Sequence, residues 1–246
     1  MEHNNCKKCR GNNILFLAVI SYSYFLANDL YNRCAELGGK VNAISYTLML
    51  NDPYFILLLS LSLTTFFADA TYNKIKMMLS IKYAVRFSIG VGLKLSLWLC
   101  FVSIIRFLPN ISFSNTWDDS IKALSTYAKG NMHFWYINNN IIESMSPVQS
   151  LIEAVIVIVM YSVFTAFIIC ACRKIKPMLA IVAITCFSDF QVINDLPSIF
   201  TYISPQSIMR ISLTSSLNFV YLIGYYLTLI TLIIGYLLSS KGGMQK

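Results

Sequence analysis

Four of the charged residues in the apolar stretches of this sequence are candidates for contact with a solute or an ion: Arg86, Lys94, Glu153 and Asp189. Lys94 follows Arg86 by eight residues, about 12 Å along a helix, and Gly90 shares their helical face. The Lys94 side chain is too short to extend easily over that distance to the membrane surface. Lys94 is therefore predicted to face the bundle interior, a wet cavity or an acidic partner. The sequence is compatible with two roles for Lys94: a structural ion pair, for example with Asp69, or a contact with substrate.

The two acids are weaker candidates for a transport pathway than the two cations. Intramembrane carboxylates are functional candidates in general. Glu153 and Asp189, however, fall near the predicted outer ends of their apolar segments, where water can reach them. Ordinary polar residues at helix ends are therefore the alternative interpretation for both.

Residue types needed for catalysis are sparse. The only histidines, His3 and His133, lie outside the apolar segments, and the sequence contains no Gly-x-Ser-x-Gly, His-Glu-x-x-His or phosphate-binding Gly-x-x-x-x-Gly-Lys-Ser/Thr motif. The set His3, Cys6 and Cys9 offers three metal ligands where a structural zinc site usually needs four. We therefore expect no enzyme activity, no metal and no cofactor in this chain. If the protein moves a solute with energy from ATP, another chain must hydrolyse that ATP.

Composition indicates an all-α membrane protein with several spans. Of 246 residues, 57% are hydrophobic and only 12% are charged, whereas a soluble domain has roughly 25% charged residues. The net charge of +8 is explained by positive residues retained in cytoplasmic loops. It therefore does not indicate a nucleic-acid partner.

Six apolar segments are long enough, or nearly so, for the roughly 20 residues that cross a bilayer. Twelve of the nineteen Lys and Arg residues fall on one side of the resulting topology, which predicts that both termini are cytoplasmic. We expect one transmembrane domain, 1–246, and a multi-pass protein of a bacterial cytoplasmic membrane. The predicted spans are 14–30, 53–68, 84–107, 149–172, 177–196 and 216–239, the first two being short for a crossing.

The stretch 66–94 joins the second and third predicted spans through a cationic connector. Ile75, Met78 and Leu79 recur at the spacing of an amphipathic helix, with Lys74 and Lys76 among them. A helix of two turns on the cytoplasmic membrane face is predicted here. The aromatic-rich segment 108–148 is predicted to cover the outer face, as an interfacial cap or a ligand-binding lid, and 187–215 to enter the membrane and return.

This connector resembles the coupling helix of permeases of the ATP-binding cassette (ABC) type-2 exporter family. Phe67-Ala-Asp69 is similar to the acid-bearing end of the family's second span, and Lys74 to Ile81 to its apolar turn. Arg86 and Gly92-Leu-Lys94 are similar to the arginine and the Gly-Lys pair that follow. The sequence departs from the family pattern at Lys82, where a proline is usual, and in the long 108–148 segment.

The resemblance implies a half-transporter. Two permease subunits, identical or related, would form a pathway for peptides, antimicrobial agents or other amphiphiles, and two ATPase subunits would bind ATP and Mg. The segment around 69–80 would couple to the ATPase through Asp69, Lys74, Ile75, Lys76, Met78 and Leu79. The alternatives are a six-span substrate-binding subunit or small-solute carrier without an exporter ATPase, and a membrane enzyme.

Overall fold

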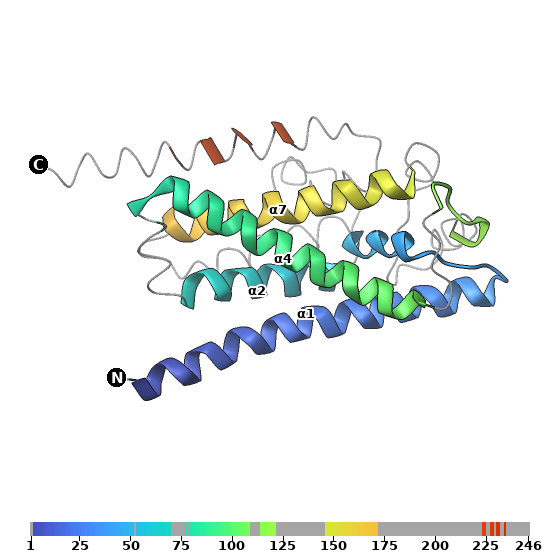
Figure 1. Ribbon diagram of the computed structural model, residues 1–246, viewed down its shortest axis with the longest axis horizontal. Coiled ribbons are helices and arrows are strands. Elements are labelled where there is room, and N and C mark those ends of the chain that lie inside the picture. The colour runs from blue at the N-terminus through green and yellow to red at the C-terminus, as the bar shows by residue number, and fades with distance from the viewer. Residues whose placement is uncertain are drawn as a thin grey trace, which may run out of the picture.

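The computed structural model describes residues 2–51, 53–69, 77, 79–108, 114–121 and 146–171, together with single or paired positions between 223 and 234 (Figure 1). Five elements follow one another in these ranges, and none of the described residues forms a strand. They are α1 (Glu2–Glu36), the 3-10 helix η1 (Ala43–Asn51), α2 (Pro53–Asp69), α4 (Ile81–Phe107) and α7 (Pro147–Ala171).

Among the described residues, three helices are long and apolar enough to cross a membrane: Ile14–Glu36 within α1, Ile81–Phe107 and Pro147–Cys170. This confirms the prediction of a helical chain with apolar segments of membrane-spanning length. The predicted fifth span, 177–196, lies outside the described residues, and so does most of the sixth, 216–239.

The first helix runs further than predicted, to Glu36 instead of residue 30. It ends in a Schellman motif, in which Gly38 adopts a φ of 76° and the Gly39 amide donates to the Cys34 carbonyl at 3.0 Å. Asp29 and Arg33, which broke the apolar pattern in the sequence, form an ion pair of 2.8 Å on the side of this helix. Paired polar residues within α1 therefore explain the underestimated length.

The second predicted span is preceded by a 3-10 helix that the sequence pattern did not reveal. η1 begins at a cap where the Asn42 side chain accepts from the Ser45 amide at 2.8 Å. Pro53 then opens α2, at a helix position where the missing N–H costs no hydrogen bond. Figure 1 shows η1 and α2 running in the same direction, so the segment that looked short for a span is the second part of a longer, interrupted helical segment.

Side-chain caps set the starts of the other two long helices. Ser80 accepts from the Tyr83 amide at 3.3 Å and starts α4 one turn before the predicted residue 84. Arg86 therefore lies in the second turn of α4. Ser146 caps α7 in the same way, accepting from the Gln149 amide at 3.2 Å ahead of Pro147.

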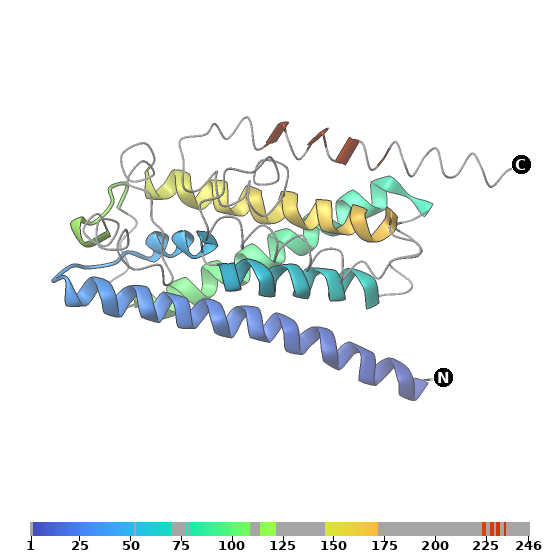
Figure 2. The same ribbon diagram turned by 180° about the vertical axis from the view of Figure 1, so that it is seen from behind.

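The four described α-helices alternate in direction. Figures 1 and 2 show the beginnings of α1 and α4 at the same end of the bundle as the last residues of α2 and α7. The two ends of the 70–80 connector therefore lie at the end where α1 begins. At the opposite end Trp117 and Ile121 are buried, and Ser120 lies against Gly39 in the turn after α1.

α4 and α7 approach each other closely at Gly92. A Cβ atom at this position would lie 2.9 Å from the Val159 Cα and 3.0 Å from the Ser162 Oγ. Small residues permit this kind of backbone approach between helices in a membrane. Gly90, two residues earlier, has no such role, since a Cβ there would meet nothing within 4 Å.

Two buried hydroxyl pairs join η1 and α2 to α7. Ser60 and Tyr161 share a hydrogen bond of 2.8 Å, and Thr47 of η1 shares one of 2.9 Å with Ser150. All four residues are buried, where the loss of a hydrogen bond costs free energy. They fix the register of η1 and α2 against α7.

The Ser60–Tyr161 bond should be measurable in a double-mutant cycle. Ser60→Ala and Tyr161→Phe should each lower the free energy of unfolding, and the double variant should lose less than their sum, with a coupling energy of about 0.5–1.5 kcal/mol. Denaturation of the four purified proteins in detergent provides the measurement. Strictly additive losses would show that the two hydroxyls do not interact in the folded protein.

Candidate functional site: a cationic, aromatic groove

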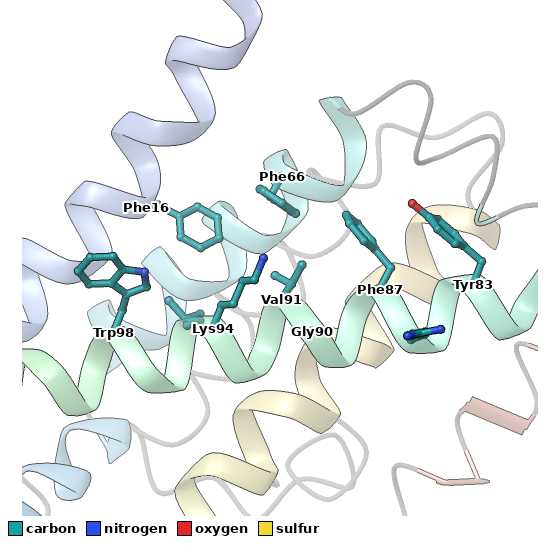
Figure 3. A pocket seen from close by; sticks show the side chains of 10 residues that line it. Phe16, Phe66, Tyr83, Phe87, Gly90, Val91, Lys94 and Trp98 are labelled. Carbon is teal, nitrogen blue, oxygen red and sulfur yellow. The ribbon is translucent and has the colours of Figure 1, made fainter.

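A groove of about 490 Å³ opens on the side of the bundle between α1, α2 and α4. One face of α4 supplies most of its wall, with Phe16 contributed by α1 and Phe66 by α2 (Figure 3). The residues from α4 follow the 3.6-residue period, which brings them onto one side of the helix. They are Tyr83, Arg86, Phe87, Gly90, Val91, Lys94, Leu95 and Trp98.

The groove combines two cations with an apolar lining. Arg86 and Lys94 are both exposed, Val91 and Leu95 form buried parts of the wall, and Trp98 is 53% exposed. Figure 3 shows the Lys94 amine rising from α4 toward the side on which Phe16 and Phe66 lie. Arg86 and Lys94 both line this groove, as expected for residues that share a helical face, and Lys94 is exposed in the described structure.

Neither groove cation forms a hydrogen bond or ion pair with another residue in the part of the chain that the structure describes. Arg106, the next cation on α4, does have partners in the described structure. Its Nε donates to the Asn28 Oδ1 at 3.0 Å, and its guanidinium carbon lies 4.2 Å from the centre of the Tyr31 ring. The cation at the far end of α4 is thus matched by α1, whereas Arg86 and Lys94 present their charges to the groove.

An aromatic cluster, consisting of Phe16, Phe66, Phe67, Tyr83 and Phe87, lies where the groove meets the connector end of the bundle. The Phe87 ring is central, with centroids 5.7 Å from Tyr83, 6.1 Å from Phe66 and 6.0 Å from Phe67. Phe16 meets Phe66 edge-on at 5.3 Å. Ring pairs at these separations stabilise beyond the area they bury, so the cluster links α1 and α2 to the first turns of α4.

The connector's described residues lie beside this cluster in sequence. Asp69 is the last residue of α2, and Met77 is buried while Leu79 is 72% exposed. Met77 was not singled out from the sequence, which assigned the apolar side to Ile75, Met78 and Leu79. The remaining predicted coupling residues, Lys74, Ile75, Lys76 and Met78, lie outside the described residues.

The two predicted acids are not brought to the groove by the described structure. Glu153 is buried, at 6% exposure, and accepts a hydrogen bond of 3.3 Å from the Gln149 Nε2 on its own helix. The expectation that water reaches Glu153 at a helix end is therefore wrong, because neighbouring helices cover that turn of α7. Asp189 lies outside the described residues.

Sequence reasoning found the cations of the site and missed its aromatic residues. Tyr83, Phe87 and Trp98 fall on the helical face of Gly90, and extending the same 3.6-residue period in both directions would have selected them. Phe16 and Phe66 carry no such signal, because only the tertiary packing of α1 and α2 brings them to α4.

The arrangement can bind a molecule that has both an apolar body and an anionic group, with the aromatic and aliphatic wall facing one part and the cations facing the other. Comparisons of this chain with protein-family models, with curated proteins and with solved structures find no match.

Proposed function

We propose that this chain is the membrane permease subunit of an ATP-driven exporter that moves peptides, antimicrobial agents or other amphiphiles out of the cell. The observation that carries the proposal is the aromatic cluster, which ties the ends of α2 and α4 together directly beside the connector that joins them. The same two helices form walls of the groove. A displacement of the connector would therefore move the walls of a binding site for amphiphiles.

The proposed motor is a separate ATPase that holds ATP and Mg. It would receive the connector, around 69–80, in a cleft and displace it when nucleotide closes the ATPase dimer. Nucleotide can drive such a change only if it favours one arrangement of α2 and α4 over another. A second permease subunit, identical or related, and the lipid of a bacterial cytoplasmic membrane complete the proposed assembly.

Leu79 provides a test of the proposed contact, because it is the described connector residue with the largest exposed apolar surface. Leu79→Asp should reduce the amount of ATPase that copurifies with the tagged chain in mild detergent about tenfold, as expected for loss of an interface residue worth more than 1 kcal/mol. The ATPase would be recognised in the eluate by ATP hydrolysis and by mass spectrometry.

The matched control is Leu108→Asp. Leu108 is also exposed, at 61%, and follows the opposite end of α4, so the same substitution there should leave copurification unchanged. If the unaltered chain copurifies with no ATPase, or if both aspartate variants retain it equally, the exporter proposal is wrong.

One observation favours the alternative of a substrate-binding subunit or small-solute carrier without an ATPase: the groove is formed within a single chain. That alternative predicts ligand binding by the isolated chain and no dependence of transport on ATP. Uptake or release of a fluorescent amphiphile by vesicles with and without the copurified ATPase distinguishes the two functions.

A further inference from the structure

Lys94 is the central residue of α4, which spans 27 residues from Ile81 to Phe107. Such a helix is about 40 Å long, so the ammonium group starts about 20 Å from either end and near the middle of a hydrocarbon core about 30 Å thick. An exposed cation at this depth is costly in lipid. An anionic group bound in the groove would match this charge and lower the cost.

The groove itself indicates the chemistry of that occupant. Its two cations have no hydrogen-bonding or ionic partner in the described part of the chain, and the rest of its lining is aromatic or aliphatic apart from the Tyr83 hydroxyl and the Trp98 indole N–H. An anion without an apolar part would gain little from Phe16, Phe66 and Val91, whereas a neutral lipid would leave both charges unmatched.

We infer that the groove binds an amphiphile with an anionic headgroup that reaches it sideways from the bilayer. Arg86 lies about 12 Å closer than Lys94 to the start of α4, so it meets the headgroup nearer the membrane surface. Lys94 then holds the anionic group at depth, and the apolar chain lies against the wall formed by Val91, Leu95 and Trp98.

This inference names the substrate class of the proposed exporter and, as a statement about transport, rests on that proposal. Binding is a property of the chain alone. If the chain binds anionic amphiphiles but captures no ATPase, this inference stands and the exporter proposal is wrong. If the chain captures an ATPase but does not prefer anionic amphiphiles, the exporter proposal stands and this inference is wrong.

Trp98 provides a probe inside the groove. The full chain carrying Trp117→Phe and Trp135→Phe retains Trp98 as its only tryptophan. It would be reconstituted into phosphatidylcholine vesicles that contain equal fractions of either brominated phosphatidylglycerol or brominated phosphatidylcholine. Bromine quenches the indole on contact, so the ratio of the two quenching curves reports the preference of the groove for the anionic lipid.

The expected preference for brominated phosphatidylglycerol is about fivefold, since one basic residue near an anionic lipid contributes about 1 kcal/mol. Lys94→Gln should reduce this ratio to about one. Lys82→Gln is the matched control, because Lys82 is an exposed cation in the first turn of α4 that does not line the groove, and it should retain the full preference.

A second variant tests the groove without changing its charge. Gly90 lines the groove, and a Cβ there would meet nothing within 4 Å, so Gly90→Leu should fill part of the space and weaken quenching by phosphatidylglycerol. Equal quenching by both lipids in the unaltered chain, or a preference that survives Lys94→Gln, would overturn the inference. An acid of the protein would then match Lys94, and Asp189→Asn would lower the melting temperature as Lys94→Gln does.

Discussion

Gly92→Leu is expected to separate α4 from α7 and to lower the free energy of unfolding by about 3 kcal/mol. The first side-chain atom would already lie 2.9 Å from the Val159 Cα. That neighbour is backbone, so no change of rotamer can relieve the overlap. The two helices must move apart, and the loss of close packing along their crossing is the source of the destabilisation.

Gly90→Leu is the control for this change, because Gly90 is two residues away on the same helix and a Cβ there would lie in open space. Replacing it should leave the stability within about 1 kcal/mol of the original, with helix propensity acting in favour of leucine. Thermal or chemical unfolding in detergent, followed by circular dichroism, compares the two variants. Equal stability of both would contradict the close approach of α4 and α7.

Phe87→Ala is expected to disconnect the groove from the ATPase while leaving ATP hydrolysis in place. The half-buried Phe87 ring contacts Tyr83, Phe66 and Phe67. Its removal should cost about 2 kcal/mol of interaction between α2 and α4, which corresponds to about a thirtyfold weaker coupling between nucleotide binding and the groove.

The change in Trp98 fluorescence when a nonhydrolysable ATP analogue is added to the reconstituted complex measures this coupling. The Phe87→Ala complex should show a response close to zero at an unchanged rate of ATP hydrolysis. Phe25→Ala is the matched control, since Phe25 is an exposed ring of α1 outside the aromatic cluster. A full response from Phe87→Ala would show that the signal does not pass through the cluster.

Local signals predicted much of the helical architecture. The apolar runs at 53–68 and 149–172 gave α2 and α7 nearly their observed bounds. The predicted helix ends are wrong where polar side chains pair with one another within a helix or cap its first turn. The Asp29–Arg33 pair hid the last turn of α1, and the Ser80 cap moved the start of α4.

Features that depend on tertiary packing could not be predicted from a local sequence pattern. The periodicity of α4 placed Arg86, Gly90 and Lys94 on one face, but it could not tell whether that face looks into the bundle or away from it. Only the positions of Phe16 and Phe66 make it a groove. Burial of Glu153 likewise depends on neighbouring helices that its own sequence context does not specify.

The sidedness of Leu79 tests the central claim most directly, because a cytoplasmic motor can reach the connector only from the cytosol. In a variant with all seven cysteines replaced by alanine, Leu79→Cys and Leu108→Cys would each be exposed to a membrane-impermeant maleimide in right-side-out and inside-out vesicles. We predict that Leu79→Cys reacts only in inside-out vesicles and Leu108→Cys only in right-side-out vesicles. Labelling of Leu79→Cys from the extracellular side would contradict the proposed coupling of this chain to a cytoplasmic ATPase.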